Sequence, residues 1–257
     1  MRSVAGTELT RTQYLQHIAS DYNLMVTALA GPVLPVPTCP GWETNTLAKH
    51  MGMVYLHQAF VIESSERPEN KEHLRYLTGS ETEMELLAAG HSAISDALDP
   101  DRAERTTWSW HHNDFSVDFW FRRMAHETVI HRVDAQIANG ITPEISELLA
   151  LDGVDEVLDF LPLLGSWDGA PNVDFGIVSI AAHTSTGQKH WTLEFTGEKA
   201  SVTASTQVDS NARLIISADA AAMDLYLWGR IESSDPRITL TGDDEAGFKQ
   251  LMQVAVN

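Results

Sequence analysis

The residues that decide the fold run from 119 to 134 and have the sequence FWFRRMAHETVIHRVD. They predict the centre of a helix over about Ser116–Asn139. Glu127 and His131 stand four residues apart, so their side chains project from one face of that helix, one turn apart. His126 and His131 diverge by about 140°, because successive residues of a helix turn by about 100°. The segment therefore lacks the metalloprotease pattern, in which two histidines four residues apart flank a glutamate, and it offers Glu127 with His131 as a pair of ligands.

Apolar residues spaced three and four apart predict further helices on both sides of this segment. The predicted spans are Glu8–Ala30, Thr44–Ile62, Glu81–Leu98 and Ile145–Leu164. We expect Thr44 to be the N-cap of its helix, and the last span, which contains Gly153, to be kinked or split. Long helices joined antiparallel predict a helical bundle.

The pattern changes to period two after Pro171, which is typical of strands. The predicted elements are strands at Ile177–His183, His190–Thr196, Ala200–Ser205 and Ala212–Ser217, a helix capped by Asp219, a strand at Ile238–Leu240 and a helix at Asp243–Val254. The order β-β-β-β-α-β-α predicts an α+β module with its own core. We therefore expect two domains, a helical bundle over residues 1–165, which contains Glu127 and His131, and an α+β domain over residues 172–257.

The composition excludes several classes of partner. The chain has 257 residues, with 36 acidic and 17 basic side chains and a formal net charge of -19. This charge repels phosphate backbones and anionic lipids, so we expect neither nucleic acid nor a membrane as a partner. The longest uncharged stretch is interrupted by prolines between residues 32 and 40, and the N-terminus lacks the apolar core of a signal peptide. The single cysteine, Cys39, allows no internal disulfide, is interpreted as a packed loop residue, and fits a cytoplasmic protein.

His50 is the candidate for a third ligand. It lies between Leu47 and Met51 on the helix face that is expected to point into the bundle. With Glu127 and His131 it would complete a set of two histidines and one glutamate. Three protein ligands leave a zinc ion one open position for water, substrate or a thiol, which is the catalytic arrangement.

Structural interpretations of these residues stay open at this point. Glu127 could instead pair with Arg123, four residues earlier on the helix. His50 could be a hydrogen-bonded core residue. Asp134, three residues after His131, is either a partner that orients the imidazole or a carboxylate that faces solvent or a neighbouring arginine.

Several motifs follow one another along almost the whole chain. They are Val36–Trp42, Leu47–Gly52, Arg122–Glu127, His131–Ala135, Leu151–Leu158, Asp224–Arg230 and Asp235–Arg237. In this order they resemble the actinobacterial maleylpyruvate isomerase family of mycothiol-dependent enzymes. The resemblance implies an N-terminal DinB-like four-helix bundle followed by a small α+β domain like a sterol carrier protein. It also implies a divalent metal ion, usually zinc, on His50, Glu127 and His131, with mycothiol as the thiol cofactor and Arg230 as the residue that holds a substrate carboxylate.

The activity that this resemblance implies begins with a metal-activated thiolate that attacks a small electrophilic acid. Addition to a conjugated cis double bond, rotation and expulsion of the thiol would make the protein an isomerase. The same addition without expulsion would make it a mycothiol S-transferase. Two further hypotheses are a metal hydrolase, with hydroxide in place of the thiolate, and a non-catalytic protein that retains the metal and binds a small ligand.

Overall fold

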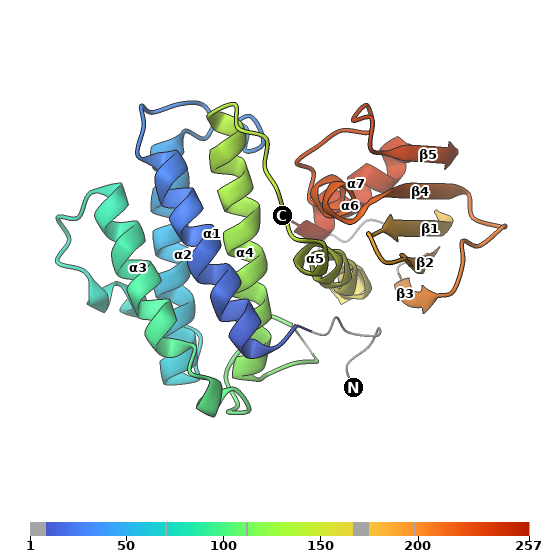
Figure 1. Ribbon diagram of the computed structural model, residues 1–257. Coiled ribbons are helices and arrows are strands. Elements are labelled where there is room, and N and C mark those ends of the chain that lie inside the picture. Colours follow the sequence, from blue (N-terminus) through green and yellow to red (C-terminus); the bar gives the residue numbers. More distant parts are fainter. Residues whose placement is uncertain (1–8, 70, 112, 167–174, 198, 257) are drawn as a thin grey trace. The chain divides into compact units, whose positions relative to one another are not determined.

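A computed structural model describes residues 9–69, 71–111, 113–166, 175–197 and 199–256. The chain forms two compact units, one from Leu9 to Pro143 and one that begins at Glu144 (Figure 1). The first is helical and the second combines a sheet with helices, which confirms the predicted fold class. Within the described ranges, no helix is long and apolar enough to cross a membrane.

The boundary between the units lies earlier in the chain than the predicted one at residue 165. Helix α5 (Glu147–Asp159), which the sequence analysis assigned to the bundle, packs against α6 (Ala220–Leu227) and belongs to the second unit. Periodicity identifies an amphipathic helix but not the surface that its apolar face covers. Residues 167–174, around the predicted start of the second domain, lie outside the described residues.

The described part of the N-terminal unit contains a bundle of α-helices, as predicted. Its elements are α1 (Arg11–Leu29), α2 (Thr44–Ser64), η1 (Glu72–Tyr76), α3 (Glu83–Ala97), η2 (Pro100–Arg102) and α4 (Val117–Ala138), of which η1 and η2 are short 3-10 helices. Helix α1 packs against α4, and α2 packs against both α3 and α4. Each α-helix contributes fully buried side chains to the core between them, among them Met25, Leu47, Leu87 and Trp120.

Local contacts fix the ends of the helices that carry the candidate ligands. The Ser116 hydroxyl accepts a hydrogen bond from the backbone N–H of Phe119 at the start of α4, which ends before Gly140 at a φ of 68°. The prediction that Thr44 caps α2 is wrong, because Thr44 is the first residue of the helix. Its hydroxyl accepts a hydrogen bond of 3.1 Å from the backbone N–H of Leu34. This side chain therefore closes the preceding loop.

Helices α2 and α3 approach closely because glycines lie where they meet. A Cβ atom on Gly90 would lie 2.5 Å from the carbonyl oxygen of Gly52. A Cβ atom on Gly52 would lie 2.8 Å from the backbone of Leu86. This contact sets the position of α2 two residues beyond His50.

The second unit is built on a five-stranded sheet. Its elements are α5, η3 (Leu161–Ser166), β1 (Gly176–His183), β2 (Gln188–Thr196), β3 (Lys199–Ser205), β4 (Leu214–Asp219), α6, β5 (Thr239–Gly242) and α7 (Glu245–Val256). The strand order is β3-β2-β1-β4-β5, in which β1 and β4 run parallel and the other pairs antiparallel. Ile180, Trp191 and Ile216 stand side by side in this register and are fully buried. The predicted order after Pro171 is confirmed, and the predicted helix Ile145–Leu164 is split into α5 and η3.

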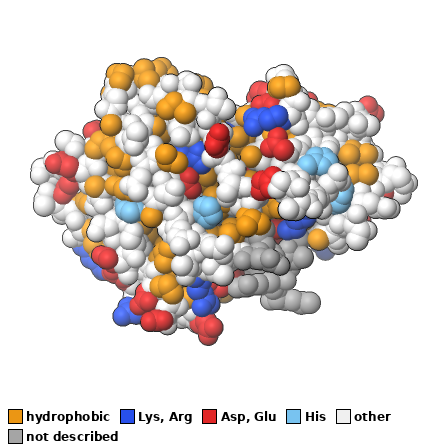
Figure 2. Space-filling view, viewed as in Figure 1, with side chains coloured by type: hydrophobic (Ala, Val, Ile, Leu, Met, Phe, Trp, Pro, Cys, Tyr) orange, Lys and Arg blue, Asp and Glu red, His pale blue; other side chains and the backbone are white. Residues whose placement is uncertain are grey.

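Acidic side chains are dispersed over the face of the molecule drawn in Figure 2. On the face drawn in Figure 2, acidic groups are interspersed with lysines and arginines and do not gather in one patch. Surface ion pairs such as Arg75 with Glu63 and Arg237 with Asp235 engage some of them. On this face the negative charge therefore does not mark one site.

Candidate metal centre

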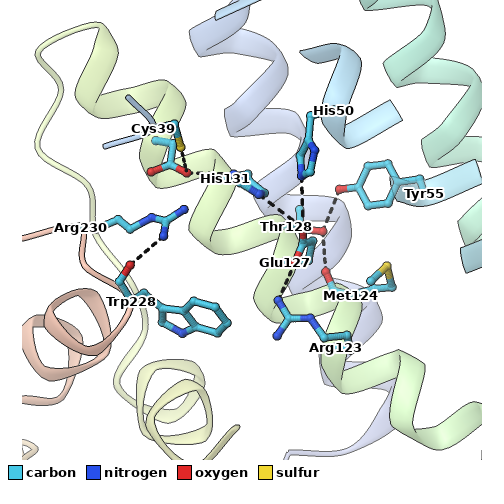
Figure 3. A network of polar contacts seen from close by, with 11 residues as sticks. Cys39, His50, Tyr55, Arg123, Met124, Glu127, Thr128, His131, Trp228 and Arg230 are labelled. Carbon is cyan, nitrogen blue, oxygen red and sulfur yellow. Dashed lines mark hydrogen bonds and ion pairs between the residues drawn. The ribbon is translucent and has the colours of Figure 1, made fainter. Parts of the chain in front are cut away.

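Two helices of the bundle bring His50, Glu127 and His131 together (Figure 3). His50 projects from α2, and the other two project from successive turns of α4. Glu127 Oε1 lies 3.6 Å from His50 Nε2 and 3.4 Å from His131 Nε2. The side chains of His50, Glu127 and His131 are 33%, 20% and 11% exposed, so small molecules have access to the trio mainly at His50.

The spacing of these atoms fits one divalent ion. Atoms bonded to a tetrahedral zinc ion at about 2.0–2.2 Å lie about 3.3–3.6 Å apart. The two distances from Glu127 Oε1 to the imidazole nitrogens, 3.4 and 3.6 Å, agree with that separation. Two imidazoles and one carboxylate are also a ligand set of catalytic zinc sites, which keep a further position open.

Arg123 supports Glu127 from the preceding turn of α4. Its Nη2 atom donates a hydrogen bond of 2.6 Å to Oε2, which leaves Oε1 toward the two histidines. Burial raises the pKa of Glu127, but the charge of Arg123 and hydrogen bonds from His131 and His50 outweigh it and hold the pKa well below its usual value. The carboxylate is therefore ionised at neutral pH, as a metal ligand must be. The pair with Arg123, considered as an alternative to a ligand role, accompanies the trio and does not replace it.

Asp134 contacts the far side of the His131 ring. The Nδ1 atom of His131 lies 2.8 Å from Asp134 Oδ2, and the Asp134 side chain is fully buried. Burial lowers the pKa of His131, but the contacts with Asp134 and Glu127 outweigh it and raise the pKa to about 9. At this pKa the metal-free ring is protonated on both nitrogens at neutral pH. The Nδ1–H group that donates to Asp134 turns Nε2 toward Glu127 and His50, and a metal ion that displaces the Nε2 proton would find the lone pair in that direction. Of the alternatives for Asp134, the structure contains the contact that orients the imidazole.

The loop between α1 and α2 supplies contacts that the sequence analysis did not assign to the site. The Thr38 hydroxyl donates a hydrogen bond of 2.5 Å to Asp134 Oδ1, and the Cys39 thiol lies 3.5 Å from Asp134 Oδ2. The Trp42 ring centroid lies 4.8 Å from that of His50 and 6.3 Å from that of His131. Helical spacing could not reveal these contacts because the loop has no periodicity. The available signals were the position of the loop directly before the His50 helix and its Val36–Trp42 motif.

A buried hydrogen bond joins the two ligand-bearing helices beside the trio. Tyr55 of α2 and Thr128 of α4 have their hydroxyl oxygens 2.8 Å apart, and Thr128 donates to the carbonyl of Met124 (Figure 3). Burial raises the pKa of Tyr55, so its hydroxyl stays protonated. Thr128 follows Glu127 directly, and this bond therefore fixes α4 against α2 at the level of the ligand.

Arg230 lies in the second unit, just beyond α6. Gly229, at a φ of 71°, and Arg230 donate backbone hydrogen bonds to the carbonyls of Tyr226 and Leu225, which is the hydrogen-bond pattern that commonly ends a helix. The guanidinium Nη1 donates a hydrogen bond of 2.7 Å to the carbonyl of Trp228. The structure thus places the cation at the carboxyl end of α6, where the helix dipole favours it. Its role toward a substrate stays a prediction.

Comparison with known proteins finds a family match for the N-terminal unit and a structural match for most of the chain. Residues 15–136 match the family described as the mycothiol maleylpyruvate isomerase N-terminal domain. No curated protein matches the sequence. A crystal structure of the mycothiol-dependent maleylpyruvate isomerase aligns with a TM-score of 0.56 and 13% identity over 92% of this chain and 95% of that chain. A crystal structure of a histidine-to-alanine mutant of a protein with the same description aligns with a TM-score of 0.56, 11% identity and the same coverage.

At these identities the solved structures show a shared fold, which extends over both units. The family match covers the segment that holds His50, Glu127 and His131. Residues 15–136 of the N-terminal unit are thus identified as a mycothiol maleylpyruvate isomerase N-terminal domain.

Proposed function

We propose that the protein is a mycothiol-dependent isomerase of the maleylpyruvate isomerase type, with a divalent metal ion, preferably zinc, at His50, Glu127 and His131. The observation that carries this proposal is the placement of Glu127 Oε1 at 3.6 and 3.4 Å from the two imidazole nitrogens, in a domain that matches this family. A low-molecular-weight thiol and a small electrophilic acid would be its ligands. Because thiol chemistry and a single cysteine suit a reducing compartment, we place the protein in the cytoplasm.

The residues of the centre would divide the work as follows. His50 and His131 would offer Nε2 and Glu127 would offer Oε1 to the ion. A bound divalent metal lowers the pKa of a coordinated thiol, so that the sulfur is a thiolate at neutral pH. Arg123 keeps Glu127 ionised, and Asp134 keeps the His131 ring turned with Nε2 toward the other ligands.

The reaction would use the thiol twice. A thiol bound at the metal would supply a nucleophile for one carbon of a conjugated cis double bond, so that the former double bond could rotate as a single bond. Loss of the same thiolate would restore the double bond in the trans geometry. The thiol is regenerated and no oxidant or reductant is consumed, so the net change is isomerisation alone.

We assign the substrate carboxylate to Arg230. A guanidinium binds a carboxylate through two parallel hydrogen bonds, which fixes the orientation of a planar acid. Arg230→Ala is expected to raise KM about 10- to 100-fold, the range for losing a hydrogen bond to a charged group, and to leave the metal content unchanged. Arg230→Lys retains the charge without the paired geometry and should recover part of the loss. An unchanged KM in Arg230→Ala would remove this residue from the proposal.

The test of the proposed function is thiol dependence. The zinc-loaded protein is incubated with maleylpyruvate, with and without mycothiol, and the cis and trans isomers are quantified by proton NMR. We expect conversion with mycothiol, none without it, and none in Glu127→Gln. Glu43→Gln, which changes an exposed acid at the N-terminus of α2, is the matched control and should be as active as wild type.

The other hypotheses predict different results in the same experiment. Accumulation of a thiol adduct without the trans isomer would identify an S-transferase. Hydrolysis of the substrate without thiol would identify a hydrolase. Binding of the substrate without any reaction would identify a non-catalytic protein. Any of these three results would overturn the isomerase proposal.

A further inference from the structure

A loop segment, residues 34–43, which is the part of the connection between α1 and α2 that leads into α2, contacts the candidate metal centre at two points. Near its middle, Thr38 and Cys39 reach Asp134 on α4. Near its end, the Trp42 ring packs against the rings of both candidate histidine ligands. The loop thus lies directly outside the ligand trio.

The loop backbone is held in a defined shape. The backbone N–H of Val36 donates a hydrogen bond of 2.9 Å to the carbonyl of Trp42. The N–H of Cys39 donates a hydrogen bond of 3.1 Å to the carbonyl of Val36, and the N–H of Trp42 donates one of 2.9 Å to the carbonyl of Cys39. Pro37 and Pro40 further restrict the backbone on both sides of the Thr38–Cys39 pair. The loop therefore presents the Thr38 hydroxyl at a fixed position.

The Asp134 carboxylate accepts a hydrogen bond from Thr38 and also contacts the ring of His131. Thr38 Oγ1 donates to Asp134 Oδ1 at 2.5 Å, while Asp134 Oδ2 lies 2.8 Å from His131 Nδ1. Asp134 is fully buried, and a buried carboxylate needs hydrogen-bond donors to remain stable. With one oxygen held by the loop and the other held by the imidazole, rotation of the carboxylate would break both bonds together.

We propose that Thr38 is a positioning residue of the metal centre, acting through Asp134 on the His131 ring. The hydroxyl fixes the plane of the Asp134 carboxylate, and the carboxylate fixes the ring with Nε2 toward Glu127 and His50. This inference rests on the proposed function, because it assumes that the trio holds a metal ion. It assigns a role in metal affinity to a loop residue that does not touch the ion.

Cys39 contacts the same carboxylate, but we expect it to contribute less than Thr38 to fixing the carboxylate's position. Its sulfur lies 3.5 Å from Asp134 Oδ2, and a thiol is a weak hydrogen-bond donor. The hydroxyl of Thr38, at 2.5 Å, is the stronger donor. Loss of the thiol should therefore change the metal affinity less than loss of the hydroxyl.

The experiment measures the zinc dissociation constant by competition with a chromophoric chelator, for the full-length protein and its variants. Loss of a residue that hydrogen-bonds to a metal-bound histidine typically weakens metal affinity about 10- to 100-fold. Thr38 contacts Asp134 and not the histidine itself, so we expect its loss to weaken the affinity by about the lower of these values. We therefore predict that Thr38→Val raises the zinc dissociation constant about 10-fold and that Thr38→Ser leaves it near that of wild type. Cys39→Ala should raise the zinc dissociation constant less than Thr38→Val does. Thr46→Val, on the exposed surface of α2, is the matched control and should bind zinc as wild type does.

Circular dichroism of the metal-free proteins checks that each variant is folded, and Thr38→Ala replaces Thr38→Val if the latter is not. The visible spectrum of the Co²⁺-loaded proteins gives a second readout, which should change in the variant without the hydroxyl and be restored in Thr38→Ser. Wild-type zinc affinity in Thr38→Val, or a greater loss in Cys39→Ala, would overturn this inference and leave the proposed function intact. Failure of the wild-type protein to bind zinc would overturn the proposed function itself.

Discussion

Glu127 in the bundle and Asp155 in the second unit are helical carboxylates with different partners. Two partners of Glu127 are imidazoles, whose Nε2 atoms offer a lone pair once they are deprotonated. The contacts of Asp155 include the ammonium of Lys189 and the indole N–H of Trp191, the latter at 2.7 Å, and both groups donate hydrogen. The first carboxylate therefore has the partners of a candidate ligand set, and the second belongs to an ion pair that holds α5 on β2.

This difference shows that the chemistry of the partners, more than burial, separates a site from a structural contact. Asp155 is 2% exposed and Glu127 is 20% exposed, so burial alone would have selected Asp155 as the unusual group. Only Glu127 of the two faces nitrogens that become free ligands when a metal ion displaces their protons. The comparison predicts that changes at Glu127 act on metal binding and that changes at Asp155 act on stability.

The largest expected effect is that of metal removal on the stability of the protein. A ligand present at about 1,000 times its dissociation constant stabilises the folded state by about 4 kcal/mol. We expect thermal unfolding of the zinc-loaded protein to shift to lower temperature when the metal is chelated. Glu127→Gln should unfold at the same temperature with and without zinc. Equal zinc stabilisation of wild type and this variant would break the comparison.

Removal of the Asp155 carboxylate should lower stability and spare metal binding. Removing one partner of a buried ion pair costs about 3–5 kcal/mol. Because the Lys189 side chain is 23% exposed and retains access to solvent, we expect a smaller loss, about 2–3 kcal/mol, for Asp155→Ala. Urea unfolding measures the loss, and zinc titration should give the wild-type stoichiometry. Asp155→Asn, which can still accept from Trp191, should lose less.

Substitution of Gly153 would sharpen the account of α5, on which Asp155 lies. A Cβ atom on Gly153 would lie 2.5 Å from a carboxylate oxygen of Asp224 on α6. Such overpacking costs about 1–3 kcal/mol, and the gain in helix propensity offsets about 1 kcal/mol of it. We expect Gly153→Ala to destabilise the protein in urea unfolding. A stabilised variant would show that α5 and α6 do not pack as closely as described.

The smallest expected effect is the contribution of His91 to the pH dependence of the free energy of unfolding. Burial lowers the pKa of His91 from its usual 6.5, and its ring stacks on Tyr22 at 3.6 Å. The unfolded chain therefore binds the proton more readily, and this residue's contribution to stability falls as the pH drops below 6.5 toward the lower pKa of the folded state. Unfolding free energies of His91→Phe between pH 7 and 5 should depend on pH less than those of wild type. One proton limits the difference to about 1.4 kcal/mol per pH unit. Identical slopes would contradict the prediction.

Much of the fold could be predicted because the two units carry different periodicities. Spacing of three and four gave the helices of the bundle to within a few residues, and alternation gave the strands after Pro171 in their correct order. The placement of α5 was missed because an amphipathic pattern shows which face is apolar but not what covers it. The role of Thr44 was missed for a similar reason, since its loop partner, Leu34, lies ten residues away.

The candidate trio was accessible from the sequence to different degrees. Glu127 and His131 share a helix, so their four-residue spacing placed them together. His50 lies on another helix, and its selection depended on the apolar residues around it and on the family resemblance. The contacts of Thr38 and Trp42 depend on how a loop folds onto α4, which no spacing rule encodes. The contact of Asp134 with His131 was one of two open alternatives until the side chains were seen.

The binding of one divalent ion by His50, Glu127 and His131 is best tested by measuring how much metal the protein contains. Elemental analysis of the purified wild-type protein should find about one zinc or similar ion per chain. The ion should be lost in His50→Ala and in Glu127→Ala, and retained in Asp155→Asn. Absence of metal from all of these proteins, even after reconstitution with zinc, or its full retention in both ligand variants, would contradict the account.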